Sequence, residues 1–161
     1  MFCPRSDLWK GFNATHGLAV WDPTPLYDNV TGDTFLFFGG PGRTKGHHWD
    51  IWMMQSEDQG STWAAPRNIS SMCGRAGTMG YGLSGDTPSG GAGVQLTTGR
   101  LIVPMYAGIP AGRTICYSDD HGKEWKVAHT DGQDATEGEV VELFPEKNKL
   151  AGSSPTLLYT I

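Results

Sequence analysis

Long apolar runs are missing from this 161-residue sequence. No segment approaches the ~20 consecutive apolar residues of a membrane span. Residues 1–17 also lack the apolar stretch of ~7–15 residues that marks a secretory signal peptide. We therefore expect neither a transmembrane segment nor a signal peptide within this chain, which leaves the compartment open between lysosomal or secretory and cytoplasmic.

Positive charge is scarce as well. The chain has 12 Lys and Arg residues against 17 Asp and Glu residues, which gives a net charge of -5. Proteins that bind DNA or RNA neutralise phosphates with a basic surface. The charge balance therefore argues against nucleic acid as a partner.

Cysteine and histidine do not form any recognisable ligand pattern. The cysteines are Cys3, Cys73 and Cys116. They have no C-x-x-C spacing, and an odd number cannot form a closed disulfide framework, so we expect buried free thiols. His47, His48 and His121 have no partner Cys or Glu at zinc-ligand spacing. No cofactor and no metal are predicted.

Glycine and aromatic residues, by contrast, are plentiful. The sequence has 23 glycines, 10 prolines and 11% aromatic residues. This composition is typical of many short strands joined by tight turns rather than of long helices. We therefore predict an all-β fold.

An eight-residue pattern, S-x-D-x-G-x-x-W, occurs at residues 56–63 and again at residues 118–125, each time after an apolar run. Its Ser and Asp can bond to backbone N–H groups of a turn, its Gly supplies a positive φ, and its Trp begins the next strand. We predict a structural role, a self-supporting hairpin turn, for both octets. Their fixed residues are Ser56, Asp58, Gly60, Trp63, Ser118, Asp120, Gly122 and Trp125.

Two further strand-like runs precede each octet, with turns at Gly32-Asp33 and at Thr98-Gly99. These runs are residues 18–20 and 34–38 before the first octet, and residues 93–96 and 101–106 before the second. With one strand after each Trp, they make two four-stranded antiparallel units, and a third unit opens at residues 139–143. Repeated four-stranded sheets are typical of β-propeller blades. Between the first two units, residues 71–91 form either a disordered linker or a glycine-rich functional loop.

Three other segments also resemble motifs of one protein family. Residues 21–28, W-D-P-T-P-L-Y-D, resemble an N-P-x-P-x-x-D motif, and residues 91–106 resemble G-x-G-x-Q-L followed by G-R-L-V-V-P. Residues 136–143, T-E-G-E-V-V-E-L, are similar to N-E-x-Q-V-V-E-L. Together with the two octets, known as Asp-boxes or BNR repeats, these motifs resemble those of the sialidase (neuraminidase) family.

The resemblance implies a six-bladed propeller of which this chain holds two blades and part of a third. The expected units are residues 16–71, residues 91–130 with the preceding loop 72–90, and residues 131–161. It also implies an exo-α-sialidase homologue that hydrolyses terminal sialic acids of glycoproteins, gangliosides or oligosaccharides. Sialylated glycoconjugates are then the expected partners.

The resemblance assigns Glu137 as the catalytic base. Sialic acid carries a carboxylate on its anomeric carbon, which would repel a carboxylate nucleophile, and the family uses a Tyr that needs a neighbouring base. Here Thr136 stands where the family usually has Asn. The alternative is that Glu137 is a solvated acid, with Asp134, Glu139 and Glu142 as competitors.

Three more residues match substrate-binding positions. Asp22 would contact a hydroxyl or the N-acetyl region of the sugar, or it caps a turn before Pro23. Tyr106 would line the glycerol or aglycone side, or it packs in the barrel. Trp21 would line the N-acetyl pocket, or it packs in the core.

Other parts of the family's machinery have no match in this chain. They are the general-acid Asp, the Tyr nucleophile and the arginines that bind the substrate carboxylate. Arg43, Arg75, Arg100 and Arg113 match no arginine of that clamp, and we expect surface roles for them. The chain is therefore expected to be a fragment that is inactive by itself.

Two other functions stay open at this point. One is a non-catalytic Asp-box propeller that binds glycans or proteins, and the other is an incomplete product without an independent fold. In addition, Asn13, Asn29 and Asn68 each begin an N-x-[ST] triplet. These triplets are either glycan acceptors, which would favour a secretory location, or chance occurrences in a Ser/Thr-rich chain.

Overall fold

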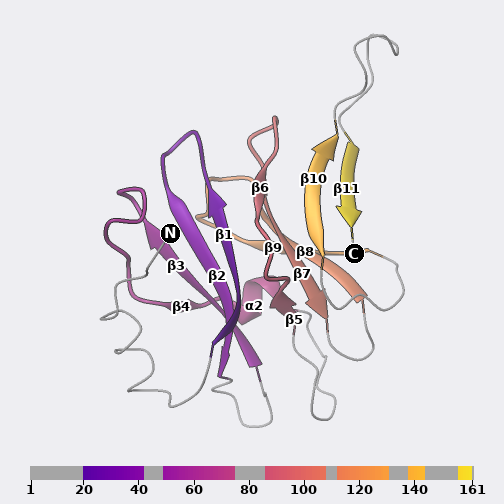
Figure 1. Cartoon of the computed structure of the whole chain (residues 1–161), viewed down its shortest axis with the longest axis horizontal. Helices are drawn as coiled ribbons and strands as arrows, with labels where there is room; N and C mark the ends of the chain where they lie inside the picture. Colours follow the sequence, from indigo (N-terminus) through magenta and orange to yellow (C-terminus); the bar gives the residue numbers. More distant parts are fainter. Residues whose placement is uncertain are drawn as a thin grey trace.

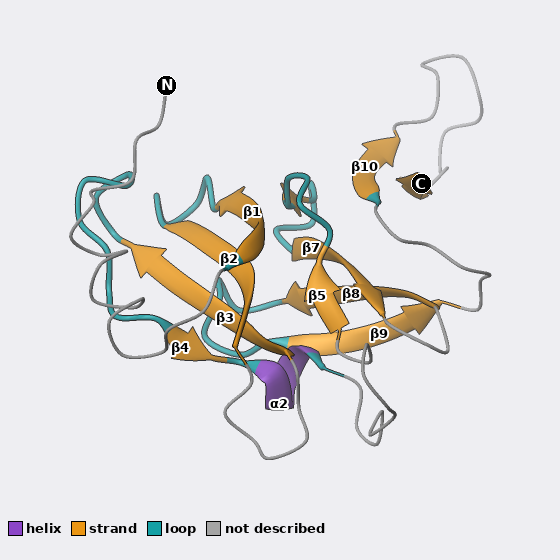
Figure 2. Cartoon of the chain, turned by 60° about the horizontal axis from the view of Figure 1, so that its bottom comes forward, coloured by secondary structure: helices purple, strands orange, loops and turns teal. Residues whose placement is uncertain are grey.

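The computed structural model of the chain describes residues 20–41, 49–74, 86–107, 112–130, 138–143 and 156–160. In these ranges the chain forms three antiparallel sheets that follow one another across the molecule (Figure 1). The first sheet has the order β1 (Trp21–Tyr27), β2 (Thr34–Pro41), β3 (Trp49–Ser56) and β4 (Arg67–Asn68). It is followed by the one-turn helix α2 (Ser70–Cys73), which packs against β3 of this sheet and against the next sheet (Figure 2).

The second sheet has the order β5 (Asp86–Pro88), β7 (Leu101–Ala107), β8 (Gly112–Ser118) and β9 (Lys126–Thr130). Strand β6 (Val94–Gln95) also pairs with β7, so the inner strand of this sheet consists of the two pieces β5 and β6. The third sheet is the hairpin of β10 (Glu139–Leu143) and β11 (Thr156–Thr160). The all-β prediction, with two four-stranded units and a third that opens at Glu139, is confirmed.

The prediction for the first strand fails at the one residue where it can be checked. The sequence favoured residues 18–20; residues 18 and 19 lie outside the described ranges, Val20 is outside any strand, and β1 begins at Trp21. Strand β1 contains Pro23 and Pro25, which count against a central strand. Strand β1 lies at the edge of its sheet and pairs only with β2. The two prolines lack a backbone N–H, and an edge strand tolerates this because only one of its sides forms hydrogen bonds with a neighbouring strand.

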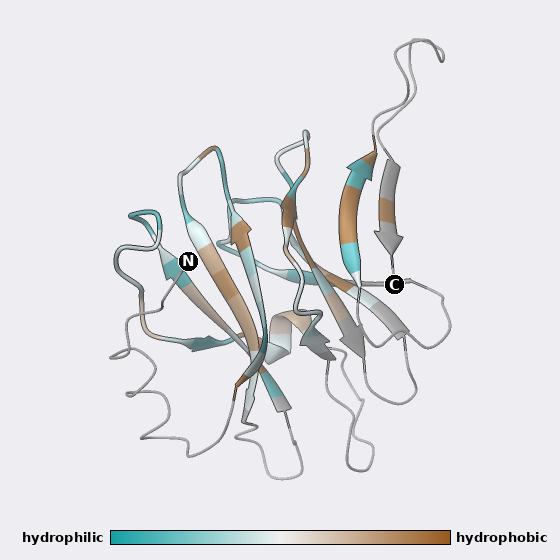
Figure 3. Ribbon diagram, in the orientation of Figure 1, coloured by the Kyte–Doolittle hydropathy of each residue, from teal (hydrophilic) through white to brown (hydrophobic). Residues whose placement is uncertain are grey.

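The main core lies between the first and second sheets. The middle of β2 is hydrophobic (Figure 3), and Phe35 and Phe37 are both fully buried. Trp125, from the second octet, meets both rings edge-on, with centroids 5.7 and 4.9 Å away. Trp63, from the first octet, packs in a separate cluster with Phe38 and other residues of the first sheet. The two octets thus insert their tryptophans on corresponding sides of consecutive sheets.

One polar contact between neighbouring sheets occurs twice. Gln95 Oε1 accepts a hydrogen bond of 2.8 Å from the backbone N–H of Asn29, in the turn after β1. Glu142 Oε2 accepts one of 2.9 Å from the backbone N–H of Thr97, in the turn after β6. In each case, an inner-strand side chain of one unit holds the turn of the preceding unit. We call these two contacts the clasps.

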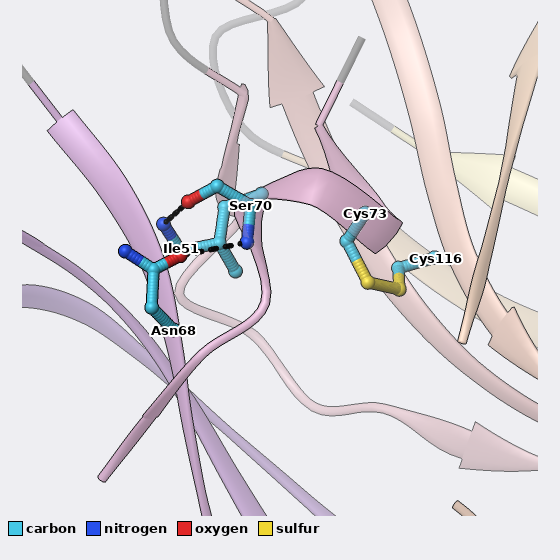
Figure 4. The surroundings of a disulfide bond; sticks show 5 residues. All are labelled: Ile51, Asn68, Ser70, Cys73 and Cys116. Carbon is cyan, nitrogen blue, oxygen red and sulfur yellow. Dashed lines mark hydrogen bonds between the residues drawn. A yellow bond between two sulfur atoms is a disulfide. The ribbon is translucent and has the colours of Figure 1, made fainter. Parts of the chain in front are cut away.

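The prediction of free thiols is wrong for two of the three cysteines. Cys73 and Cys116 form a disulfide, with their Cα atoms 5.2 Å apart and both residues fully buried (Figure 4). Cys73 is in α2 and Cys116 in β8, so the bond joins the first unit to the second sheet. The pairing depends on packing between residues 43 positions apart, which spacing rules do not detect. Cys3 lies outside the described residues.

The structure describes both ends of the glycine-rich segment 71–91. Helix α2 and strand β5 occupy its two ends, so the linker interpretation does not hold there. Residues 75–85 lie outside the described ranges. Within the described part of the chain, no helix is long and apolar enough to cross a bilayer.

Candidate active site

Strand register separates two edges of the molecule. Tyr27 pairs with Thr34, and Thr34 pairs with Ser56, so the β1–β2 turn and the first octet lie at the same edge. The second sheet repeats this arrangement, because Leu101 pairs with Ser118. We call this the turn edge, and the opposite one, where β1 and β5 begin, the site edge (Figure 1).

Both octets form the predicted self-bonded turns at the turn edge, but Trp63 does not begin the next strand, since β4 starts only at Arg67. Ser56 Oγ accepts from Gly60 N–H at 2.7 Å and donates to Asp58 Oδ1 at 2.8 Å. Asp58 also accepts from the hydroxyl and the N–H of Thr62, both at 2.7 Å, and these bonds together with the Ser56 bond lower its pKa to about 2. Gln59 and Gly60 both have positive φ. The first octet is thus stabilised by its own side chains.

The second octet repeats these bonds. Ser118 Oγ accepts from Gly122 N–H at 2.9 Å and donates to Asp120 Oδ1 at 2.8 Å. Asp120 accepts from Glu124 N–H at 2.9 Å, and this bond is the main cause of its lowered pKa. Neither octet is at the site edge, which agrees with their predicted structural role.

Asp22 lies at the site edge in an unusual conformation. Its φ is 52°, in the left-handed region, and the register of β1 against β2 shifts between Trp21 and Thr24. Thr24 Oγ1 donates to Asp22 O at 3.3 Å and accepts from Gly90 N–H at 3.2 Å. Aspartate adopts this conformation more readily than most residues, and Gln59 and His121 in the octets also have a positive φ, so the conformation alone does not mark a functional site.

Gly90 faces Asp22 from the second sheet. It too has a positive φ, of 75°, and it lies where the inner strand is interrupted between β5 and β6. A Cβ at Gly90 would be 3.7 Å from both the Cα and the Oδ1 of Asp22. Asp22 therefore lies directly beside Gly90 of the second unit.

The third sheet begins beside the next residue. A Cβ at Gly91 would be 3.2 Å from Glu139 Cγ and 3.7 Å from Gly138 O. Three inner segments, around Asp22, Gly90–Gly91 and Gly138–Glu139, therefore converge at the site edge. Glu137 itself lies outside the described residues, although it directly precedes Gly138.

Trp21 and Tyr106 belong to the same edge. Trp21 is half-buried, and its indole nitrogen lies in the space that a Cβ on Gly39 would occupy. The same Cβ would be 2.7 Å from Thr87 Oγ1. Thr87 pairs with Tyr106 in the β5–β7 ladder. The backbone of Tyr106 is thus at the site edge, and its side chain lies outside the described part of the structure.

Sequence reasoning missed Thr87. This residue is 5% exposed, and within the described ranges its hydroxyl has no hydrogen-bond partner. A buried polar group without a partner calls for an explanation such as a water or a ligand. The only signal in the sequence was its place at the end of the glycine-rich segment 71–91.

Arg100 lies at the turn edge, away from the candidate site. Arg100 pairs with Asp119 through Nε–Oδ1 at 2.6 Å, and this bond raises its pKa. Its guanidinium also lies 4.6 Å from the centre of the Tyr117 ring. The expected surface role of Arg100 is thus confirmed. Among the described residues, no group of three or more His, Cys, Asp and Glu side chains could hold a metal ion.

Comparisons with known proteins agree with this architecture. Residues 7–152 match the model of the BNR repeat-like domain. Sialidase-2 of Cricetulus griseus is 30% identical over 138 residues, which are 75% of this chain and 36% of that enzyme. A sialidase of Bacteroides fragilis is 32% identical over 144 residues, which are 78% of this chain and 25% of that enzyme. The chain thus spans about a third or less of these curated relatives.

A solved structure gives the same fold. The Hadza microbial sialidase Hz136 superposes with a TM-score of 0.72 at 22% identity. The match covers 92% of this chain and 34% of that one. The three sheets are therefore consecutive parts of a β-propeller.

Proposed function

The chain belongs to the BNR repeat-like domain family, and we propose that it supplies part of the sialic-acid site of an exo-α-sialidase. Such an enzyme would hydrolyse terminal sialic acids of glycoproteins, gangliosides or oligosaccharides without a cofactor. The observation that carries this proposal is the convergence of the segments around Asp22, Gly90–Gly91 and Gly138–Glu139 at the site edge.

In this proposal Glu137 is the catalytic base. A carboxylate nucleophile would meet the like charge of the sialic-acid carboxylate, and a neutral phenol avoids that repulsion. A Tyr hydroxyl with a pKa of about 10 is a weak nucleophile at neutral pH until a base takes its proton. Glu137 would accept that proton from the Tyr nucleophile of the family, for which this chain has no matching residue.

The internal repeat supports this role for Glu137. The clasps make Gln95 and Glu142 equivalent positions of consecutive units. Gly90, the left-handed residue that faces Asp22, is five positions before Gln95, and Glu137 is five positions before Glu142. In the repeat, Glu137 of the third unit is therefore equivalent by sequence position to Gly90 of the second unit, the residue that borders Asp22.

The other site residues would bind the sugar. Asp22 would accept a hydrogen bond from a hydroxyl or from the N-acetyl N–H of the substrate. Its position at the site edge beside Gly90 supports this role, because the second unit adjoins the residue there. Trp21 would contact the N-acetyl group, and Tyr106 the glycerol or aglycone side.

A non-catalytic Asp-box propeller that binds glycans or proteins is the competing function. Such a scaffold needs the octets, which lie at the turn edge. It has no need for an acidic residue beside Gly90 at the site edge, and this placement of Asp22 therefore favours the enzyme.

Two experiments test the proposal. The purified chain alone should release no more sialic acid from a fluorogenic sialoside than its Glu137→Gln variant, because the acid, the nucleophile and the arginines are unmatched in it. A chimera in which this chain replaces the matching segment of Cricetulus griseus Sialidase-2 should be active. Glu137→Gln should lower its kcat by about 100-fold or more, as expected for loss of a general base.

The chimera needs a matched control. Ser56→Ala, at the turn edge, should leave the kcat of the chimera within about twofold, since it touches no substrate in this proposal. A folded, active chimera that tolerates Glu137→Gln would overturn the role of Glu137. Folding is checked by circular dichroism in each case.

A further inference from the structure

Two of the three N-x-[ST] triplets lie in described parts of the chain, and their environments differ. Asn29, in the triplet Asn29-Val30-Thr31, is exposed in the turn after β1. Only its backbone N–H is engaged, by Gln95 in the clasp. Within the described residues its side-chain amide makes no hydrogen bond, so the amide nitrogen is accessible.

Asn68, in the triplet Asn68-Ile69-Ser70, is also exposed, but its side chain is held by its neighbours (Figure 4). Its Nδ2 donates to Asp50 Oδ2 at 2.7 Å, and Asp50 is only 3% exposed. Its Oδ1 accepts from Ser70 N–H at 3.0 Å, while Ser70 Oγ accepts from Ile51 N–H at 2.9 Å. A sugar on Nδ2 would meet the buried carboxylate and the β3 backbone.

The disulfide adds an independent observation. Cys73 and Cys116 are fully buried and join the two large sheets. Structural disulfides form mainly in oxidising compartments such as the secretory pathway. Transfer of glycans to N-x-[ST] triplets occurs on secreted proteins. The disulfide therefore indicates that the chain folds in an oxidising compartment, where the Asn29 triplet would be modified.

We propose that Asn29 is an N-glycan attachment site and that Asn68 is not. The amide nitrogen Nδ2 of Asn29 would attack C1 of the first sugar of a polyprenyl-pyrophosphate-linked oligosaccharide. A C–N bond forms, the C–O bond to the pyrophosphate breaks, and the amide loses one proton as the polyprenyl pyrophosphate leaves. This inference does not depend on the proposed enzymatic function.

The position of Asn29 is compatible with such a modification. It follows the seven-residue strand β1, and Asp22 is near the start of that strand. At about 3.3 Å per residue, the glycan would begin roughly 20 Å from Asp22. A glycan at Asn29 would thus leave the site edge open.

The test uses the whole chain, fused to a secretion signal and expressed in a eukaryotic host. Glycopeptides from both medium and cell extract are analysed by mass spectrometry before and after peptide N-glycosidase F, so that poorly secreted variants are also measured. Most molecules should carry a glycan at Asn29, and fewer than a tenth of them at Asn68. Thr31→Ser should retain the glycan at Asn29, while Thr31→Ala and Asn29→Gln should remove it.

Two results would overturn the proposal. One is an unmodified Asn29 in the wild-type chain, and the other is an occupancy at Asn68 that equals that at Asn29. The second result would mean that the contacts of Asn68 in the fold do not decide its modification.

Discussion

The imidazole Nδ1 of His121 lies 2.7 Å from the carboxylate Oδ2 of Asp28, across the boundary between the first and second sheets. Asp28 is fully buried, and its other oxygen accepts bonds from Val30 N–H at 2.9 Å and from Gln95 Nε2 at 2.7 Å. Burial raises the pKa of Asp28, but these bonds and the nearby His121 together outweigh it and hold the pKa below 3.8. The ionised form of Asp28 is therefore the one that joins the sheets.

Asp28→Asn should change how stability depends on pH. A lowered folded pKa contributes stability that is complete above pH 3.8 and is lost as the pH falls below that value. The variant should be less stable at neutral pH by about 1–3 kcal/mol, since Gln95 and His121 lose a charged partner. Its free energy of unfolding should fall less steeply than that of the wild type in acid. Urea unfolding at a series of pH values measures both effects, and parallel pH profiles would contradict this role.

The two octets should respond differently to loss of their serines. Ser118→Ala leaves the N–H of Gly122 without its partner, and Gly122 is buried against Phe35. We expect this change to cost about 1–3 kcal/mol of unfolding free energy. At Gly60, which is partly exposed, water can replace the serine, so Ser56→Ala should cost only about 0.5–1.5 kcal/mol. Thermal and urea unfolding of both variants would give the order, and a larger loss for Ser56→Ala would refute the explanation.

The disulfide can be counted directly. Since Cys73 and Cys116 are paired, the unfolded chain should show one reactive thiol, that of Cys3, before reduction. All three cysteines should react after reduction. A double change to serine at positions 73 and 116 should lower the free energy of unfolding by about 3–4 kcal/mol, as expected for a loop of this size. Three reactive thiols in a chain purified without reductant would mean that the bond does not form.

Gly39→Ala tests the packing at the site edge. The new methyl group would collide with Trp21 and with Thr87 Oγ1. We expect a loss of about 1–3 kcal/mol in stability from this overpacking. Gly99→Ala is the control, because its Cβ would meet nothing within 4 Å and only its positive φ is strained.

The same two variants test where the sugar binds. If binding of methyl α-sialoside, followed by saturation-transfer NMR, is weakened by Gly39→Ala but not by Gly99→Ala, the site edge is the binding edge. Equal binding by both variants would count against that assignment.

Local chemistry explains what the sequence could predict. The octets were predictable because Ser, Asp and Gly bond within a single turn, and the turns at Gly32 and Gly99 because both need a positive φ. The Cys73–Cys116 bond and the Asp28–His121 contact were not predictable. Their partners are 43 and 93 positions apart and meet only when two sheets pack.

At the candidate site, too, only some features could be predicted from the sequence. Asp22 and Trp21 were named through a family resemblance, and the structure adds the left-handed bulge and the contact with Gly90. Thr87 was missed because a threonine without a hydrogen-bond partner is recognised only once the structure shows that it is buried. The roles of Asp22, Trp21, Tyr106 and Glu137 all stay predictions.

The clasps have a consequence for how this chain can diverge. In both of them a side chain of the later unit binds main-chain N–H, at Asn29 and at Thr97. Any residue except proline offers the same N–H, so position 29 can change without loosening its joint, whereas Thr97 also donates its hydroxyl to Glu142 Oε1 at 2.8 Å. Selection should act instead on the acceptors Gln95 and Glu142. A triplet such as Asn29-Val30-Thr31 could thus be gained or lost in descendants at little cost to the fold.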